Sequence, residues 1–258
     1  MLTKISRLIL KKNKSKIVCL TAYSKNIAEA IDQYADLILV GDSLGSVLYD
    51  FDTTRKVKLS MMIEHSKSVR KGLKRSIMIV DMPFNTYKNK SQALKNCKKV
   101  LRETKCDGIK LEGGTKIKEI IKHLIKNKIP VMGHIGITPQ TVRGKFKYKG
   151  KTVSEKNRLI KDSKSLEDAG VFAIVLECIE RNLSKEITEK LNIPTIGIGS
   201  SNVCDGQILV TDDLLGLTNS KIKFVKRYIN LKSNIRKAAI KYKSEVKNKI
   251  YPSKRYSY

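Results

Sequence analysis

Short runs rich in Ile, Val and Leu recur along this 258-residue chain, and they constrain its fold more than any other feature. The apolar residues in each run are continuous, which is typical of parallel strands covered on both faces by helices. We therefore predict parallel strands at Lys16–Thr21, Asp36–Val40, Ser76–Asp81, Gly108–Glu112, Pro130–His134, Val171–Glu177, Pro194–Ile198 and Ile208–Val210.

Most of these runs are separated by segments whose apolar residues have helical spacing. We predict helices over Ser60–Gly72, Ser91–Glu103, Thr115–Asn127 and Ser154–Ala169, with Gly170 as a stop signal after the last. Strands alternating with helices over a chain of this length predict a (β/α)8 barrel, or TIM barrel. The alternative is an open doubly wound sheet, but no G-x-G-x-x-G motif follows the first run, and GIGSSN at Gly197–Asn202 does not fit that motif.

The pattern changes after Leu217, where a basic segment with helical character replaces the alternating runs. We predict a single catalytic domain over residues 1–258, with the barrel over about 16–217 and an appended helical extension over about 218–258 that contains a helix at Lys221–Ile250. No apolar run reaches the roughly 18–20 residues of a membrane-spanning helix. Residues 1–16 also lack the pattern of a secretory signal. We therefore expect a cytoplasmic protein without a membrane partner.

The chain is strongly basic, because 53 Lys and Arg residues outnumber 24 Asp and Glu residues to give a net charge of +29. Such a charge can indicate a nucleic-acid-binding protein. Here, however, the basic residues are spread over the whole chain and are mostly Lys, whereas bidentate contacts to phosphates and bases favour Arg. We expect no specific nucleic-acid partner, and a basic scaffold that binds RNA remains the non-enzymatic alternative.

Polar and ionisable residues follow the predicted strands at their C-terminal ends, where the active sites of such barrels lie. A single Asp or His at such a place more often caps a helix or packs in the core. Five consecutive strands, however, each supply an acid or an imidazole. Lys110 and Glu112 are two residues apart, so both should point to the same side of their strand. The candidate residues are Asp42, Ser43, Asp81, Lys110, Glu112, His134 and Glu177.

Three of these residues form a candidate metal site. Asp42, Asp81 and Glu112 come from neighbouring strands and offer carboxylate oxygens, the ligands that Mg2+ prefers. Zinc would require more nitrogen or sulfur ligands. The five cysteines show no C-x-x-C spacing, and two of the three histidines fall within predicted helices.

Longer stretches of the sequence resemble the ketopantoate hydroxymethyltransferase family, in unbroken order from about Ile17 to Leu217. GDSLG and GHIGITPQ are the most specific of them. The matching stretches are Leu20–Tyr23, Leu39–Gly45, Asp52–Thr54, Asp81–Phe84, Ile109–Gly114, Val131–Gln140, Leu176–Cys178, Ile193–Gly199 and Cys204–Val210. The sequence departs from the family's Gly-Ile-Gly-Ala-Gly pattern at Ser200 and Ser201.

The resemblance implies a (β/α)8-barrel transferase of pantothenate biosynthesis. Such an enzyme moves a hydroxymethyl group from 5,10-methylenetetrahydrofolate to 3-methyl-2-oxobutanoate, through a Mg2+-stabilised enolate, and forms 2-dehydropantoate (ketopantoate) and tetrahydrofolate. The resemblance matches the metal ligands to Asp42, Asp81 and Glu112, the keto-acid contacts to Asp42, Ser43, Asp81 and Lys110, a further pocket residue to His134, and the proton acceptor to Glu177.

The resemblance also implies a homo-oligomer, specifically a decamer. The alternative enzyme class is another Mg2+-dependent, enolate-forming carbon–carbon lyase of the phosphoenolpyruvate mutase and isocitrate lyase type. Such lyases usually carry a reactive Cys in a mobile loop, and no Cys of this chain is placed that way.

Overall fold

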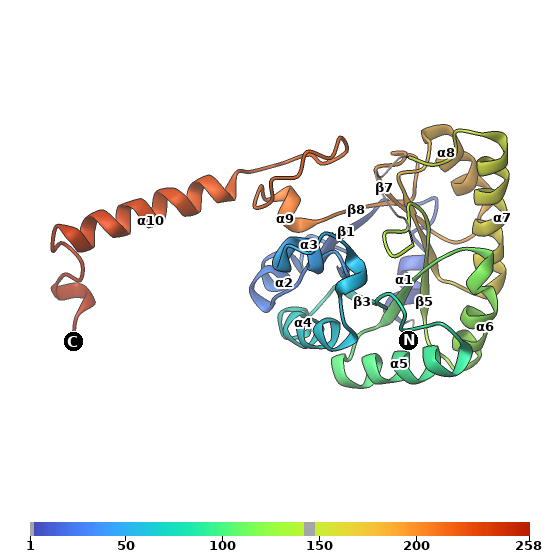
Figure 1. The fold of residues 1–258 in the computed structure, drawn as a ribbon, viewed down its shortest axis with the longest axis horizontal. Coiled ribbons are helices and arrows are strands. Elements are labelled where there is room, and N and C mark those ends of the chain that lie inside the picture. Colours follow the sequence, from blue (N-terminus) through green and yellow to red (C-terminus); the bar gives the residue numbers. More distant parts are fainter. Residues whose placement is uncertain (1–2, 142–147) are drawn as a thin grey trace. The chain divides into compact units, whose positions relative to one another are not determined.

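The structure is a computed structural model that describes residues 3–141 and 148–258. Within these residues, parallel strands pair in sequence order and close into a barrel, because the last strand also pairs with the first (Figure 1). The predicted TIM barrel is therefore confirmed, with strand ends close to those predicted. The strands are β1 (Ile17–Thr21), β2 (Leu37–Val40), β3 (Ile77–Asp81), β4 (Gly108–Glu112), β5 (Val131–Gly136), β6 (Ala173–Glu177), β7 (Thr195–Ile198) and β8 (Gly206–Leu209).

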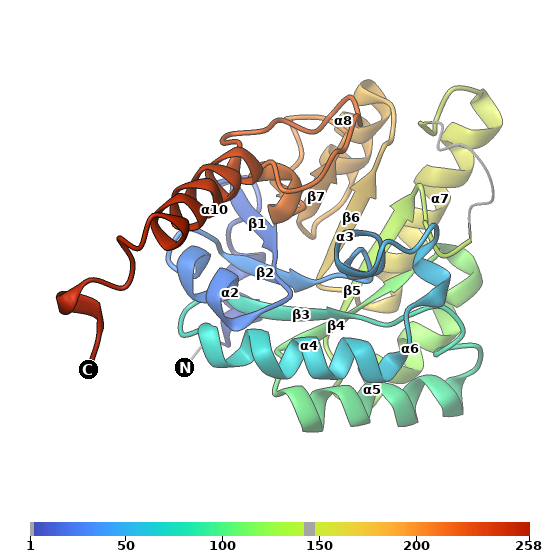
Figure 2. The same ribbon diagram turned by 60° about the vertical axis from the view of Figure 1, so that its left-hand side comes forward.

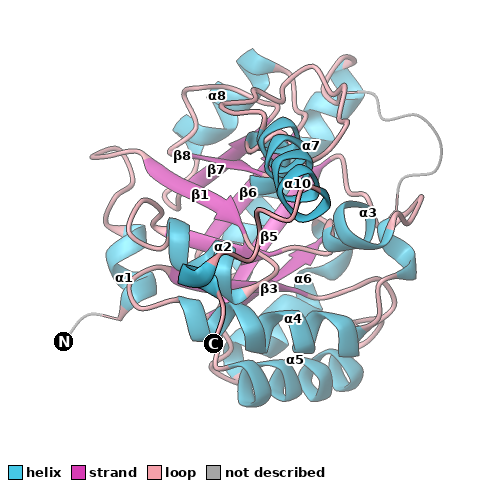
Figure 3. Ribbon diagram, turned by 90° about the vertical axis from the view of Figure 1, so that its left-hand side faces the viewer, coloured by secondary structure: helices cyan, strands magenta, loops and turns pink. Residues whose placement is uncertain are grey.

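Helices cover the outside of these strands (Figure 3). Figure 2 shows α4 (Leu59–Gly72) and α5 (Lys90–Thr104) side by side along β3 and β4. The predicted helices correspond to α4, α5, α6 and α7. The helical elements of the barrel are α1 (Lys4–Ile9), α2 (Lys25–Ile31), α3 (Leu44–Tyr49), η1 (Thr54–Lys56), α4 (Leu59–Gly72), α5 (Lys90–Thr104), η2 (Thr115–Ile117), α6 (Lys118–Lys126), α7 (Val153–Ala169) and α8 (Arg181–Lys190).

Alternation along the strands produces two hydrophobic cores. Side chains such as Leu39, Ile79 and Val175 form a cluster inside the barrel. Their neighbours in sequence, such as Val80 and Leu176, point outward and pack with the helices. This arrangement follows from the two-residue period of a strand.

The N-terminal segment closes one end of the inner core. Leu8 of α1 is 2% exposed and belongs to the same cluster as residues at the starts of the strands, such as Ile17 and Ile77. Ile5 and Ile9 of α1 pack against the same cluster, so this helix is part of the barrel's inner core. Full burial of such a Leu side chain contributes about 2 kcal/mol.

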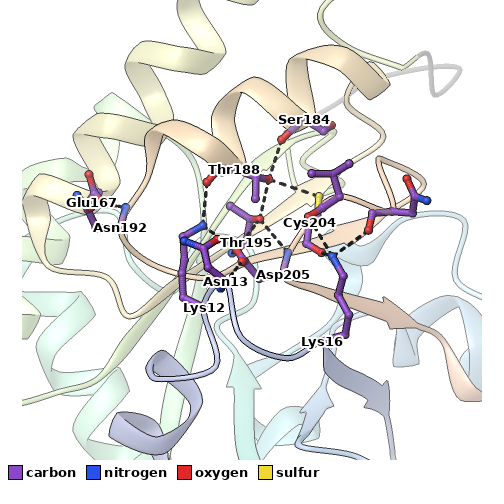
Figure 4. A network of polar contacts seen from close by, with 12 residues as sticks. Lys12, Asn13, Lys16, Glu167, Ser184, Thr188, Asn192, Thr195, Cys204 and Asp205 are labelled. Carbon is purple, nitrogen blue, oxygen red and sulfur yellow. Dashed lines mark hydrogen bonds and ion pairs between the residues drawn. The ribbon is translucent and has the colours of Figure 1, made fainter.

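A buried ion pair holds the segment after α1 against the barrel (Figure 4). Lys12 Nζ lies 2.9 Å from Asp205 Oδ2, and the two side chains are 8% and 5% exposed. Lys12 Nζ also donates to the carbonyl of Thr188 at 2.8 Å. Asp205 accepts further hydrogen bonds from the backbone N–H groups of Thr195 and Asn13. A buried charge needs such partners because desolvation is costly.

Local capping explains the limits of α7. Thr152 accepts a hydrogen bond from the backbone N–H of Glu155, and the Glu155 carboxylate accepts from the N–H groups of Gly150 and Lys151. This reciprocal arrangement satisfies backbone donors that have no partner inside the helix. The helix ends at Gly170, whose φ of 95° lies in the left-handed region that favours glycine. The predicted stop signal is confirmed.

The chain divides into two compact units, the first ending at Val210 and the second spanning Thr211–Tyr258. The second contains α9 (Thr211–Leu214), α10 (Leu231–Lys247) and η3 (Lys254–Tyr256). The helix predicted at Lys221–Ile250 is therefore too long. Asn230 begins the observed helix by accepting from the backbone N–H of Ser233, whereas the N–H of Tyr228 donates to the carbonyl of Leu214 instead of forming a helical turn.

None of the α10 side chains is buried. Across residues 3–141 and 148–258, no helix has both the length and the apolar character needed to cross a membrane.

Candidate active site

The predicted polar residues lie at the carboxyl ends of consecutive strands. Asp81 ends β3, Lys110 and Glu112 lie in β4, His134 lies in β5, and Glu177 ends β6; Asp42 follows β2 by two residues. The strand register pairs Asp81 with Lys110 and Glu112 with His134. The expectation that Lys110 and Glu112 share one side of the strand is confirmed, because Leu111 between them packs in the outer core.

Lys110 lies at the centre of the charged cluster. Its Nζ is 2.8 Å from Asp81 Oδ1 and 3.2 Å from His134 Nδ1. The other carboxylate oxygen of Asp81 accepts a hydrogen bond from the backbone N–H of Asp42 at 3.1 Å. Asp42, Asp81, Lys110 and His134 are all buried. The structure thus brings residues from β2 through β5 into one network.

His134 links this network to Glu177. Its Nδ1 lies 3.5 Å from Glu112 Oε1, and its Nε2 lies 3.1 Å from Glu177 Oε2. A neutral ring that accepts a hydrogen bond from Lys110 at Nδ1 must carry its proton on Nε2, and an imidazolium carries protons on both nitrogens. In either form, therefore, Nε2 carries a hydrogen, and this nitrogen lies 3.1 Å from Glu177 Oε2.

Burial and crowding change the acidity of these groups. Burial, with Asp81 and Glu112 nearby, raises the pKa of Asp42 well above its usual range, and burial also raises the pKa of Asp81. Burial alone would lower the pKa of Lys110, but the charges of Asp81 and Glu112 reverse this effect and raise it. Lys110 therefore remains a cation.

The pKa of His134 is also raised. Burial and the Lys110 charge lower it, but contacts with Glu112 and Glu177 outweigh both and raise the pKa of His134 to about 9. For Glu112, burial opposes ionisation, whereas the His134 contact and the Lys110 charge favour it, so its pKa is lowered. Four carboxyl groups thus share the site with Lys110 and His134, and the excess of acid favours an additional cation.

The donor set fits Mg2+ in part. Carboxylate oxygens of Asp42, Asp81 and Glu112 are hard ligands. Burial raises the pKa of Asp42 and of Asp81, and the nearby Glu112 charge raises both further. Within residues 3–141 and 148–258, however, no group of three or more His, Cys, Asp or Glu side chains is arranged to hold a metal ion. A site that fits these residues is one in which protein supplies one or two direct ligands and water or substrate supplies the others, as is usual for Mg2+.

Ser43 and Ser200, which were also singled out in the sequence, contact other groups. Ser43 is half-buried, and its Oγ contacts the hydroxyl of Tyr23 at 2.8 Å. Ser200, one of the two departures from the family pattern, donates to the carbonyl of Leu176 at 2.7 Å and accepts from the backbone N–H of Ile179. It therefore braces the turn that follows Glu177.

Gly136 lies where β5 approaches the end of β6 closely. Its φ is 103°, and the register places it opposite Glu177. A Cβ at this position would collide with the carbonyl oxygen of Glu177. The last glycine of the GHIG stretch thus permits β5 to approach the end of β6 closely.

Gln140 and Tyr87 are not among the candidate residues named from the sequence, yet both lie beside the candidate metal ligands. Gln140 is 1% exposed and hydrogen-bonds to Asp42 and Glu112. The hydroxyl of Tyr87 donates to Gln140 Oε1 at 2.6 Å. The GHIGITPQ stretch contained Gln140, but neither strand periodicity nor spacing signals these contacts.

Known proteins show strong similarity to this chain. The sequence model of the ketopantoate hydroxymethyltransferase family matches residues 3–254. A 3-methyl-2-oxobutanoate hydroxymethyltransferase from Pelagibacter ubique (strain HTCC1062) is 61% identical over 255 residues, which cover 99% of each chain. A protein of the same name from Anaplasma marginale (strain St. Maries) is 45% identical over 260 residues, covering 100% of this chain and 94% of the relative.

Solved structures of similar fold are far more distant in sequence. A phosphonopyruvate hydrolase in complex with oxalate and Mg++ has a TM-score of 0.63 at 10% identity, covering 99% of this chain and 93% of its own. A 2,3-dimethylmalate lyase of the PEP mutase/isocitrate lyase superfamily has a TM-score of 0.62 at 13% identity, covering 97% and 96%. These structures share the fold, whereas the full-length sequence matches show that the chain belongs to the ketopantoate hydroxymethyltransferase family.

Proposed function

We propose that this enzyme transfers the one-carbon unit of 5,10-methylenetetrahydrofolate to 3-methyl-2-oxobutanoate and forms 2-dehydropantoate. The observation that carries the proposal is the buried cluster of Asp42, Asp81, Lys110 and Glu112 at the mouth of the barrel. It occurs in a chain whose full-length relatives are named for this reaction. These carboxylates would repel an anionic keto acid, and a bound cation would offset that repulsion.

Mg2+ would be held by Asp42 and Asp81, with Glu112 contacting it through water. When bound, Mg2+ supplies a Lewis acid that draws electron density from the 2-keto oxygen and acidifies C3. The excess of carboxylates over cations around Lys110 and His134 supports this assignment.

Lys110 and Ser43 would bind the keto acid. The Lys110 ammonium remains charged because Asp81, Glu112 and Asp42 surround it, and it can attract the substrate carboxylate. The Ser43 hydroxyl, which contacts Tyr23, can add a hydrogen bond beside Asp42. His134 would line the same pocket.

Glu177 would act as the proton acceptor. Its Oε2 faces His134 Nε2 at 3.1 Å, which leaves Oε1 to take the proton from C3 of the keto acid. The resulting enolate forms a carbon–carbon bond with the folate-derived methylene carbon. Water supplies the hydroxyl oxygen, while the two folate nitrogens released from the methylene group each regain a proton. One C–H bond, one O–H bond of water and two C–N bonds are broken, while one C–C, one C–O and two N–H bonds form, and the products are 2-dehydropantoate and tetrahydrofolate.

A carbon–carbon lyase is the competing activity, because the structural neighbours include a 2,3-dimethylmalate lyase. Lyases of this type usually use a reactive Cys. Cys178 lies beside Glu177, but burial and the Glu177 charge raise the pKa of its thiol to about 12, so the nucleophilic thiolate is disfavoured. We therefore favour the transferase.

We further propose a cytoplasmic homo-oligomer, a decamer as in the family resemblance, with no specific nucleic-acid partner. Exposed apolar side chains on α10, including Ile235, Ile240 and Tyr242, support self-association. Light scattering coupled to size-exclusion chromatography would test the oligomer, and a monomer would contradict it.

One comparison separates the two enzyme classes. The purified protein is incubated with Mg2+ and either 3-methyl-2-oxobutanoate plus 5,10-methylenetetrahydrofolate or 2,3-dimethylmalate alone, and products are identified by mass spectrometry. The transferase proposal predicts 2-dehydropantoate in the first mixture and no cleavage in the second. Cleavage of 2,3-dimethylmalate without formation of 2-dehydropantoate would identify a lyase.

A further inference from the structure

Gln140 donates hydrogen bonds to three groups beside the candidate metal site. It follows β5 and is 1% exposed. Its Nε2 donates to Asp42 Oδ2 at 2.8 Å and to the carbonyl of Met82 at 2.9 Å. Its backbone N–H donates to Glu112 Oε2 at 3.1 Å. One residue thus contacts chain segments that follow β2 and β3 and a carboxylate from β4.

Tyr87 fixes the orientation of the Gln140 amide. Its hydroxyl lies 2.6 Å from Gln140 Oε1, closer than the 3.3 Å that separates it from the Glu112 carbonyl. Burial, with the charge of Glu112 nearby, raises the pKa of Tyr87, so the hydroxyl keeps its proton and donates. The amide oxygen must therefore face Tyr87, and the amide NH2 must face Asp42.

This arrangement uses both hydrogens of the Gln140 NH2 group and therefore prevents the amide from turning without the loss of hydrogen bonds. The NH2 group also fixes one oxygen of Asp42, and the backbone N–H fixes one oxygen of Glu112. Each contact thereby sets the direction in which the second oxygen of that carboxylate points. Asn would be too short to span these contacts, and an ionised Glu could not donate. Only a long amide at position 140 can hydrogen-bond to Asp42, the Met82 carbonyl and the Tyr87 hydroxyl together.

We propose that Gln140, held by Tyr87, is a positioning residue that orients Asp42 and Glu112 for binding a divalent cation. The inference rests on the proposed Mg2+ site but concerns this chain's own residues. Groups that orient metal ligands through hydrogen bonds typically change metal affinity or activity by about 10- to 100-fold when removed. The side chain of Gln140 contacts Asp42, and its backbone N–H contacts Glu112, so we expect replacement of the side chain to act through Asp42 with an effect within that range.

The test measures Mn2+ affinity by electron paramagnetic resonance, with Mn2+ as a probe for Mg2+, in the absence of substrates. Gln140→Met keeps the length of the side chain but removes the NH2 donors, and should weaken binding by about 10- to 100-fold. Tyr87→Phe keeps these donors but frees the amide oxygen, and should weaken binding by about fivefold, as for one net hydrogen bond. Gln33→Met, at an exposed position, is the matched control and should bind Mn2+ like the wild type.

The melting temperature of each metal-free variant is measured in parallel. Weaker Mn2+ binding by the folded Gln140→Met variant, with the graded effect of Tyr87→Phe, would support the inference. A lower melting temperature with wild-type Mn2+ affinity would show a purely structural role and overturn it. If Gln140→Met fails to fold, wild-type Mn2+ affinity in Tyr87→Phe overturns the inference. Failure of the wild type to bind Mn2+ would instead refute the metal site of the proposed function, and this inference with it.

Discussion

Replacing Glu177 with Gln should separate proton abstraction from substrate binding. Gln has nearly the same volume, and its amide oxygen can take the place of Glu177 Oε2, which lies 3.1 Å from His134 Nε2. The substitution leaves Lys110 and the three candidate metal ligands unchanged. It removes only the group that takes the C3 proton, and loss of a general base typically lowers the rate by about 100- to 10,000-fold. That range corresponds to about 3–5 kcal/mol in the activation free energy.

The assay follows this step without folate. The C3 proton of 3-methyl-2-oxobutanoate exchanges with deuterium in D2O, and NMR records the loss of the proton signal in the presence of enzyme and Mg2+. Calorimetry measures Mg2+-dependent binding of the keto acid to the same protein. Glu189→Gln, an exposed position on α8, is the matched control and should exchange at the wild-type rate.

Glu177→Gln should bind the keto acid and fail to exchange its proton. Wild-type exchange in this variant would refute the assignment of the base and direct attention to His134. Loss of both binding and exchange would show instead that Glu177 supports the structure of the site.

Three further perturbations test the electrostatics. Asp42→Asn removes a candidate metal ligand and should abolish Mg2+-dependent turnover. Because it also removes one of three crowded carboxylates, the melting temperature of the metal-free protein should be unchanged or higher. Near-normal activity would contradict the role of Asp42 as a metal ligand. Because the folded-state pKa of His134 is raised from 6.5 to about 9, its stabilising contribution should be full below about pH 6.5 and lost as the pH rises through 9. Urea unfolding in EDTA should show that the free energy of unfolding falls by up to about 3 kcal/mol over this pH interval, and by less in His134→Gln. An equal pH dependence in the two proteins would contradict the role of His134. Lys12→Met leaves Asp205 buried without its cation and should lower the free energy of unfolding by about 3 kcal/mol. This value is at the lower end for a broken buried ion pair because three hydrogen bonds to Asp205 remain. A decrease below about 1 kcal/mol in urea unfolding would show that the ion pair is unimportant for stability.

The sequence predicted those features that depend on local periodicity. Continuous apolar runs identified the strands, and the two-residue period placed Lys110 and Glu112 on the same side of β4. Because parallel strands deliver their carboxyl ends to one end of a barrel, the gathering of Asp81, His134 and Glu177 could also be predicted.

Contacts that depend on loop conformation could not be predicted in this way. Gln140 reaches Asp42, which is 98 positions away in the sequence, only because of the path that the chain takes after β5. The length of α10 was overestimated for a different reason. Lys-rich sequence continues on both sides of the helix, and its beginning depends on a single capping residue, Asn230.

Transfer of a labelled carbon is the decisive test of the proposed one-carbon transfer. The enzyme is supplied with 3-methyl-2-oxobutanoate and tetrahydrofolate carrying a 13C-methylene group, with Mg2+ in one sample and EDTA in the other, and products are followed by 13C NMR. We expect a new labelled hydroxymethyl carbon bonded to C3 of the keto acid in the Mg2+ sample, and strongly reduced labelling in EDTA. An unlabelled keto acid in the Mg2+ sample, from protein that is folded and binds the keto acid, would refute the transferase proposal.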